Sequence, residues 1–417
     1  MPNHHPGGLA MVTIGFVVPH WPPAYGGGEQ FMDRMVGILL EGTDWDLRIL
    51  TTTAPREDGF LGVSGIDESA ITRVDPVESA YATGWIDHFD SWSSSVDADV
   101  YVFSSPASYY RRDGPLDRLH GVFDGLRDRG IPFGLVHYDL NHNTNVEIQT
   151  AFREGSSWSE AAASFRAAAR DTDDYDSFAI TYQLPSAHRP DFLISCSEWS
   201  LRLLDPTDSV DGLAFHPIMD YASYRDPVAP LDGGYYQVGF VNPLVHKGCT
   251  MALNMALSLD NRQVWLRGGY ADHTKASFME MVDGMISDGS LVAELDICGF
   301  VPDIRSFLSS LSEDGLLIFP SHFEGYGMIA VEAMAAGIPV VSTDYPATVE
   351  GVGSAAKLVS PSADPFEWEW AIEEVLDDRQ RWISAGFERV RELEARQDLE
   401  IGRLIALFKR HLPEDRT

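Results

Sequence analysis

The sequence PSHFEGYGMIAVEAMAAGIPVV, which runs from Pro320 to Val341, decides the fold of this chain. The apolar run Leu316–Phe319 precedes it and predicts a buried strand that the proline ends. Gly325 and Gly327 then favour a turn, and good helix formers follow from Met328 to Ala336. A further glycine ends this helix before the next apolar strand begins. The order of strand, glycine turn, helix and strand predicts a doubly wound α/β sheet.

The same alternation occurs in both halves of the chain. In the first half, the apolar run Met11–Pro19 is followed by the glycine-rich turn Tyr25–Glu29, an amphipathic stretch to about Leu40 and the strand Asp46–Thr51. Further strands of this half are predicted at Ala98–Phe103, Ile131–Val136 and Asp191–Ser195. A second series of strands, separated by helical segments, is predicted at Tyr236–Val241, Gln263–Leu266, Leu295–Gly299, Leu316–Phe319 and Pro339–Ser342. This pattern predicts two doubly wound domains.

The length of 417 residues also favours two α/β domains over a single hydrophobic core. The segment Pro227–Gly234 is rich in turn formers and is the best linker. We therefore expect a first Rossmann-like domain at 1–225 and a second at 226–395. Residues 141–190 are polar and rich in Ala, Ser and Asp, and we predict that they form an insertion of helices and loop. The chain ends in two predicted helices, and we expect the last, within 396–417, to cross back to the first domain.

The charge of the chain excludes several classes of partner. Thirty basic and 63 acidic side chains leave a net charge of −33, which repels nucleic acid and anionic lipid. Lysine occurs only four times. An acidic, lysine-poor composition fits a salt-loving organism, in which mobile ions screen the repulsion. A high-GC genome that favours arginine codons is the competing explanation, and composition leaves both open.

The sequence also predicts the location of the protein. No apolar run approaches the ~18 residues of a membrane-spanning helix, so we expect no transmembrane segment. The start, MPNHHPGGLA, lacks the basic and apolar parts of a secretory signal. The three cysteines have neither metal nor disulfide spacing. We therefore expect a cytoplasmic protein with buried thiols, and its oligomeric state stays open.

The glycine turn before the Met328 helix is the predicted ligand site. Ligands of open α/β sheets bind at the carboxyl ends of the strands, where the helix that follows offers free N–H groups and positive dipole to a phosphate. Glu324 lies in the turn and Glu332 about one turn inside the helix, and each carboxylate can accept hydrogen bonds from sugar hydroxyls. We expect Glu332 to bind a ribose and Glu324 a transferred sugar. Lys247, which follows a strand and precedes Gly248, suits a diphosphate.

This segment resembles the Glu-x7-Glu signature of the retaining, family-4 glycosyltransferases (glycosyl transferases group 1). The resemblance implies the GT-B fold, an α/β fold with two Rossmann-like doubly wound domains that face a central cleft. Five further segments resemble parts of this family. Cys298–Asp303 resembles its base-binding loop, and Val238–Gly248 resembles the strand that delivers a diphosphate-binding lysine. Gly26–Glu29 resembles the amino-terminal glycine loop, Val136–His137 the strand end with a histidine near the donor sugar, and His216–Asp220 the hinge.

The resemblance implies a set of site residues. The catalytic residues would be Lys247, Glu324 and His137, and the donor would be bound by Gly27, Gly28, Asn242, Arg267, Phe300, Val301, Gly325, Tyr326, Gly327, Met328 and Glu332. The family often has arginine after glycine beside the phosphate, where this chain has Gly239 and Phe240, and Arg267 is the candidate to replace it. Asp97 and Asp99 have the spacing of a metal-binding pair, which arises by chance in so acidic a chain, so we expect no metal and no cofactor.

The implied activity is a hexosyltransferase-type transfer of a sugar from a nucleotide-diphosphate-sugar to an acceptor hydroxyl, with the anomeric configuration retained. The acceptor could be a glycan, a lipid-linked glycan or a small metabolite. Two alternatives remain. One is a GT-B-fold sugar-nucleotide epimerase or phosphorylase, and the other is a catalytically lapsed protein that only binds a nucleotide sugar. The donor base, the sugar, the acceptor and the linkage are left open.

Overall fold

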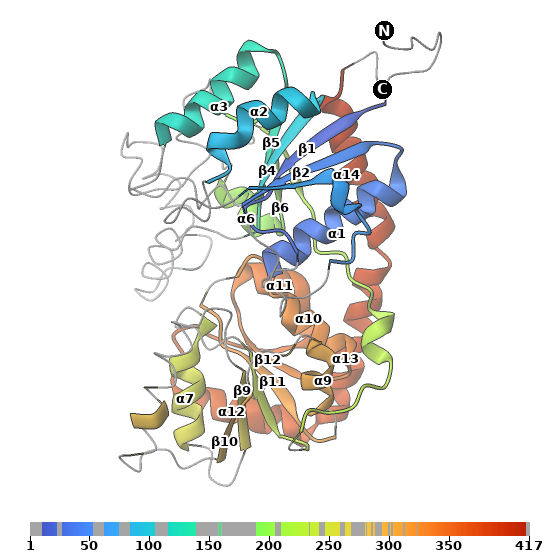
Figure 1. Cartoon of the computed structure of the whole chain (residues 1–417). Coiled ribbons are helices and arrows are strands. Elements are labelled where there is room, and N and C mark those ends of the chain that lie inside the picture. The colour runs from blue at the N-terminus through green and yellow to red at the C-terminus, as the bar shows by residue number, and fades with distance from the viewer. Residues whose placement is uncertain are drawn as a thin grey trace. The chain divides into compact units, whose positions relative to one another are not determined.

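We analysed a computed structural model of the chain. It describes residues 11–22, 27–52, 62–74, 84–104, 116–138, 157, 160, 189–204, 210–232, 234–241, 247–258, 263–267, 280, 282–284, 287, 294–298, 301, 303–311, 313–322 and 324–413. The chain forms two compact units (Figure 1). Unit 1 comprises Met1–Ile148, Ser159–Ile218 and Asp398–Thr417, and unit 2 comprises Gln149–Trp158 and Met219–Gln397. Most of the predicted insertion at 141–190 lies outside the described residues.

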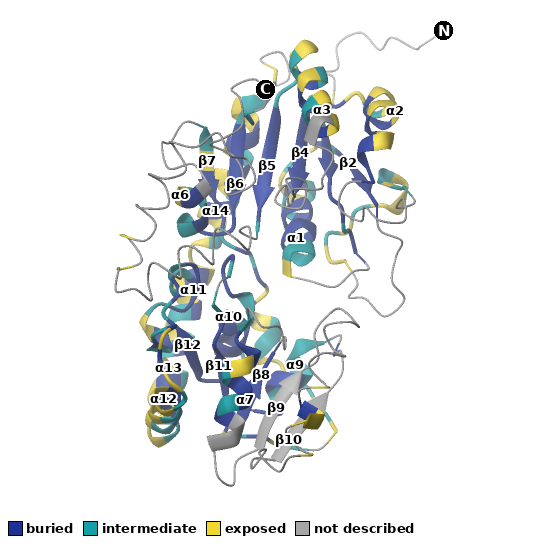
Figure 2. Ribbon diagram, turned by 90° about the vertical axis from the view of Figure 1, so that its left-hand side faces the viewer, coloured by how far each residue is buried: buried dark blue, intermediate teal, exposed yellow. Residues whose placement is uncertain are grey.

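Unit 1 is built on a parallel sheet of seven strands in the order β3-β2-β1-β4-β5-β6-β7. The strands are β1 (Thr13–Val17), β2 (Asp46–Thr51), β3 (Ile71–Arg73), β4 (Val100–Ser104), β5 (Phe133–His137), β6 (Phe192–Ser195) and β7 (Asp211–Ala214). The central strands β4, β5 and β6 are buried along their whole length, because helices cover both faces of a parallel sheet (Figure 2). Continuous apolar runs such as FGLVH are therefore the expected strand pattern.

Helices cover both faces of this sheet. Phe103 of β4 packs against Phe89 of α2 (Ile86–Val96) and Phe123 of α3 (Leu116–Asp128), with ring centroids 5.6 and 5.3 Å apart. Phe16 of β1 is level with the residue before Phe103 and so points to the opposite face, where it meets Phe408 of α14 (Gln397–His411). The last helix of the chain thus completes the core of unit 1, together with α1 (Gly27–Gly42) and α6 (Glu198–Leu204).

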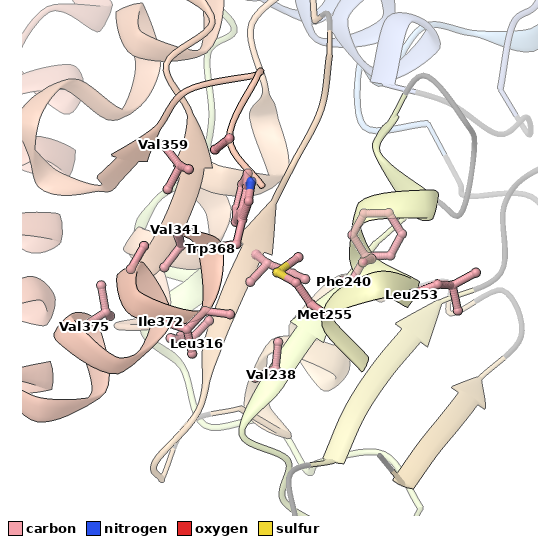
Figure 3. Packing of buried hydrophobic residues seen from close by; sticks show 14 of the residues in the cluster. Val238, Phe240, Leu253, Met255, Leu316, Val341, Val359, Trp368, Ile372 and Val375 are labelled. Atoms are coloured by element: carbon pink, nitrogen blue, oxygen red, sulfur yellow. The ribbon is translucent and has the colours of Figure 1, made fainter. Parts of the chain in front are cut away.

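Unit 2 is a second parallel sheet, with six strands in the order β10-β9-β8-β11-β12-β13. Its strands are β8 (Val238–Phe240), β9 (Gln263–Arg267), β10 (Glu294–Cys298), β11 (Leu316–Phe319), β12 (Val340–Thr343) and β13 (Lys357–Val359). The helices are α7 (Cys249–Ser258), α9 (Ile304–Ser309), α10 (Met328–Ala335), α11 (Pro346–Val352), α12 (Pro365–Asp377) and α13 (Arg379–Glu394). Trp368 of α12 lies in the core of this unit with Val238, Phe240 and Val341 (Figure 3).

Every strand predicted from the sequence is present, with small shifts at its ends, and the two carboxy-terminal helices are confirmed as α13 and α14. β3, β7 and β13 were not predicted from the sequence. All three are edge strands of three or four residues with partly exposed side chains, so they lack the long apolar run that marks a central strand. Among the described residues, no helix is both long enough and apolar enough to span a bilayer.

Candidate functional site

The turn between β11 and α10 has the conformation that its glycines predict. β11 ends at Phe319, and Gly327 caps α10 with a left-handed backbone, φ 81°. A Cβ built on Gly327 would lie 3.0 Å from a ring carbon of Phe319 and 3.2 Å from the methyl carbon of Thr348. Both the backbone angle and the lack of space therefore require glycine here. This geometry directs the first N–H groups of α10 out of the carboxyl edge of the sheet.

Glu324 in this turn forms an ion pair with Lys247, which lies between β8 and α7. The Lys247 Nζ atom lies 2.8 Å from the Glu324 Oε1 atom, and only 17% and 11% of the two side chains are exposed. The Ser321 hydroxyl donates to the same carboxylate oxygen at 2.7 Å, and Thr343 Oγ1 donates to the Ser321 carbonyl oxygen at 2.7 Å. The Glu324 carboxylate is therefore held from two sides, and two residues predicted separately form one charged centre.

Gly248 explains how Lys247 reaches this centre. Its backbone is left-handed, φ 82°, and an added Cβ would lie 2.2 Å from the Pro320 carbonyl oxygen. The backbone that carries Lys247 thus packs directly on the first residue of the glycine turn. No side chain fits between them, so the position of the lysine is set by contact between two backbones.

Glu332 is buried inside α10, with 6% of its surface exposed. Its Oε1 atom accepts a hydrogen bond of 2.7 Å from the hydroxyl of Tyr224. Tyr224 belongs to the short helix η4 (Ala222–Arg225) in the first part of unit 2. Tyr224 was not predicted as a site residue, because no local sequence pattern marks a tyrosine whose hydrogen-bond partner lies 108 residues later in the chain.

The other predicted residues of unit 2 differ in what the structure shows of them. Gly325 is buried, Met328 is half-buried and Val301 is 9% exposed. Tyr326 is 3% exposed and its ring lies beside Gly351, so its side chain packs beneath the turn. Arg267 is the last residue of β9, and its side chain is not described; Asn242 and Phe300 lie outside the described residues.

Phe240, which stands where the family often has arginine, is a core residue. It is 1% exposed and belongs to the hydrophobic cluster of unit 2 with Val238 and Leu253 (Figure 3). Because the core encloses this side chain, a charged group at this position would be costly to bury. The phenylalanine therefore contributes to the packing of unit 2.

In unit 1, the predicted glycines lie at the start of α1. Gly27 has open space where a side chain would be, whereas a Cβ on Gly28 would lie 2.2 Å from the ring of Tyr138. The Tyr138 ring also meets Phe31 edge-on, with centroids 6.4 Å apart. Gly28 thus allows the Tyr138 ring to cover the first turn of α1.

His137 is the last residue of β5 and is 1% exposed. Burial lowers its pKa from 6.5 to about 3, so the imidazole is neutral at pH 7. Neither ring nitrogen has a hydrogen-bond partner within the described residues, and the same is true of the hydroxyl of Ser195, its neighbour on β6. A neutral imidazole can donate one hydrogen bond and accept another, but at pH 7 it does not act as a cation.

In the described part of the chain, no three His, Cys, Asp or Glu side chains are grouped so that they could hold a metal ion. Asp99 accepts a hydrogen bond from the Thr13 backbone at 2.9 Å, and Asp97 ends α2 in a left-handed conformation. Both aspartates thus have structural roles at the ends of elements.

Part of the second unit is similar to known proteins. Residues 279–389 match the family Glycosyl transferases group 1. A 74-residue stretch is 36% identical to the D-inositol 3-phosphate glycosyltransferase of Corynebacterium kroppenstedtii, and it spans 17% of this chain and 16% of that protein. A stretch of 81 residues is 35% identical to the protein of the same name from Thermobispora bispora, over 18% of each chain.

Solved structures resemble the chain over nearly its whole length. Sucrose-phosphate synthase from Thermosynechococcus elongatus has a TM-score of 0.64 at 15% identity, over 96% of this chain and 98% of that one. Anabaena HepE in complex with UDP and glucose has a TM-score of 0.65 at 15% identity, over 96% and 100%. The fold is therefore GT-B, and the match to the glycosyl transferases group 1 family lies within unit 2, at residues 279–389.

Proposed function

We propose that this protein is a glycosyltransferase that moves a sugar from a nucleotide-diphosphate-sugar to an acceptor hydroxyl with retention of the anomeric configuration. The observation that carries the proposal is the Lys247–Glu324 pair at the amino-terminal end of α10, with the Glu332 carboxylate buried in the same helix. A cation, a helix end and two carboxylates are the groups that a diphosphate and its two sugars require.

The proposed chemistry breaks the bond between the anomeric carbon and the diphosphate oxygen and joins that carbon to the acceptor oxygen. Negative charge develops on the leaving diphosphate oxygen as this bond breaks, and the acceptor proton then passes to that oxygen. Lys247 and the N–H groups at the start of α10 stabilise this charge, an electrostatic task for which preorganised donors are well suited. Retention, with attack from the leaving-group side, is proposed from the likeness to the family.

The carboxylates have separate roles in this proposal. Glu324 accepts hydrogen bonds from hydroxyls of the transferred sugar, while Ser321 and Lys247 keep its Oε1 atom in place. Glu332 accepts from the ribose hydroxyls of the nucleotide. No metal ion or cofactor enters the proposed reaction, because Lys247 and the helix end supply the positive charge.

His137 acts in this proposal as a neutral hydrogen-bonding group for the transferred sugar, since its burial keeps it uncharged. A neutral imidazole can bind a sugar hydroxyl as donor or acceptor. Binding of the acceptor hydroxyl is the proposed task of unit 1.

The first experiment is a thermal-shift screen of the whole chain against UDP, GDP, ADP and TDP. A ligand that binds only the folded state raises the melting temperature. UDP is the first choice, because the structurally similar Anabaena HepE was solved with UDP and with UDP-glucose. The best nucleotide then identifies the sugar donors for a hydrolysis assay.

The screen can overturn the proposal. If none of the four nucleotides stabilises the protein and no donor is hydrolysed, the transferase function is wrong. A donor that binds but is never hydrolysed or transferred to any acceptor indicates a lapsed enzyme. Conversion of the donor into a different nucleotide sugar, with neither hydrolysis nor transfer, indicates an epimerase.

A further inference from the structure

The hydroxyl of Tyr224 makes a short hydrogen bond to a carboxylate that is almost completely buried. Its oxygen lies 2.7 Å from the Glu332 Oε1 atom, and Glu332 is 6% exposed. A carboxylate removed from water needs hydrogen-bond donors, and an O–H group that donates to a charged oxygen forms one of the stronger bonds in proteins. Tyr224 therefore stabilises the buried Glu332 carboxylate in addition to packing beside α10.

The helix that carries Tyr224 is itself held in place. Arg305 Nη1 donates to the Ser223 carbonyl oxygen at 3.3 Å, and the other guanidinium nitrogens of Arg305 grip both carboxylate oxygens of Asp303 at 2.7–3.1 Å. Asp303 also caps α9 by accepting from the Arg305 backbone N–H at 3.0 Å. This guanidinium holds the pKa of Asp303 below its usual value, so the pair stays charged at neutral pH.

These contacts connect two parts of the candidate site. Asp303 ends the segment that resembles a base-binding loop, and Glu332 is the carboxylate proposed for the ribose. The connection runs from Asp303 through Arg305 and Ser223 to Tyr224, and then to Glu332. All its members belong to unit 2.

We propose that Tyr224 is a positioning residue that orients the Glu332 carboxylate toward the two ribose hydroxyls of the nucleotide. The inference rests on the proposed function. The last torsion of a glutamate side chain is broad, so an unrestrained carboxylate turns easily. Tyr224 takes one lone pair of Oε1 and stops this rotation, which leaves Oε2 and the second lone pair of Oε1 for the ribose.

This geometry predicts selection of ribose over deoxyribose. A carboxylate held in one orientation can accept from the 2′ and 3′ hydroxyls together, and a 2′-deoxynucleotide leaves part of this buried acceptor without a donor. Tyr224 would thus determine the degree of discrimination while it makes no contact with the nucleotide itself.

The test compares binding of UDP and 2′-deoxy-UDP by calorimetry in wild-type protein and in Tyr224→Phe, with the best nucleotide of the thermal-shift screen in place of UDP if it differs. Phenylalanine removes only the hydroxyl. We expect the wild type to prefer the ribonucleotide and the variant to lose about tenfold of that preference, mainly through weaker ribonucleotide binding. Tyr235→Phe, at a tyrosine that is 46% exposed, is the matched control and should keep the wild-type ratio.

A second variant tests the same proposal without a change at Tyr224 itself. The lysine of Arg305→Lys cannot donate to both Asp303 carboxylate oxygens and to the Ser223 carbonyl oxygen at once. This variant should therefore lower the preference for UDP over 2′-deoxy-UDP by a smaller factor than Tyr224→Phe does. Circular dichroism and the melting curve show whether each variant is folded. Glu332→Gln combined with Tyr224→Phe should lose no more discrimination than Glu332→Gln alone, because both changes act on one carboxylate.

The outcomes separate the two proposals. A wild type that binds no nucleotide overturns the proposed function, and this inference with it. A wild type that binds UDP and 2′-deoxy-UDP equally overturns the ribose role of Glu332. Normal discrimination in a folded Tyr224→Phe variant overturns the positioning role of Tyr224 alone and leaves the proposed function standing.

Discussion

The Lys247 ammonium and the Glu324 carboxylate lie 2.8 Å apart, although the two residues come from different strand-to-helix connections of the second sheet. Because both are largely buried, each charge needs the other while no ligand is present. A diphosphate beside this pair would meet a lysine that is already oriented, and Glu324 is held by the Ser321 hydroxyl as well.

Lys247→Ala should lower kcat/KM for sugar transfer by about 10²–10³-fold, because it removes the cation proposed to face the leaving diphosphate. It should also lower the melting temperature, since Glu324 is left buried without its cation. Adding Glu324→Gln should restore stability but not transfer. Lys409→Ala, at an exposed lysine of α14, is the control. Full activity of Lys247→Ala would refute the role of Lys247 at the diphosphate.

Gly248→Ala should destabilise the protein by at least about 1–2 kcal/mol, the usual cost of a left-handed backbone for an L-residue. The contact of 2.2 Å with the Pro320 carbonyl oxygen adds to this cost and should displace Lys247. Gly121→Ala is the matched control, because Gly121 lies in α3 with open space around it and should gain up to about 1 kcal/mol. Urea unfolding measures both, and equal stabilities of the two variants would show that the contact is absent.

His137 should make the stability of the protein depend on pH. Its pKa is about 3 in the folded chain and near 6.5 when unperturbed, so the unfolded chain binds a proton that the folded chain does not. The contribution of His137 to the free energy of unfolding is complete above pH 6.5. It is lost as the pH falls toward 3, with a slope of about 1.4 kcal/mol per pH unit.

His137→Asn keeps a polar group but removes the titration, so its stability should fall less steeply than that of the wild type between pH 6.5 and pH 4. Thermal unfolding across this range measures the difference. His88→Asn, at an exposed histidine of α2, is the control and should keep the wild-type slope. Burial also lowers the pKa of His20. His20 is present in the wild type and in both variants, so its contribution to the pH dependence is the same in all three proteins. Parallel curves for His137→Asn and wild type would contradict the burial of His137.

Asp364→Ala should cost about 1 kcal/mol, because Asp364 and Glu367 form a capping box at the start of α12. The Glu367 backbone N–H donates to Asp364 and the Asp364 backbone N–H donates to Glu367, both at 3.0 Å. Asp377→Ala at the other end of the same helix removes a charge that the helix dipole disfavours and should cost nothing. Chemical unfolding of both variants decides whether the cap stabilises the helix.

The strands that lie inside the two sheets were predictable from local pattern, whereas β3 and β13 at the edges were not. A central parallel strand needs a continuous apolar run, as in Leu316–Phe319, since helices cover both of its faces. An edge strand such as Ile71–Arg73 is short and half exposed, so its three residues are compatible with many conformations. Its pairing is decided by the neighbouring strand.

The sequence by itself determined the glycine turn, the helix that starts at Met328 and the residue types of the candidate site. These depend on backbone angles and on periodicity, which act between residues close in the chain. Only the tertiary structure decided that Lys247 pairs with Glu324 and that Tyr224 donates to Glu332. The physical reason is that each of these contacts joins residues far apart in sequence. Lys247 and Glu324 become neighbours only when parallel strands place their carboxyl ends at one edge of the sheet. Tyr224 reaches Glu332 only because η4 packs against α10.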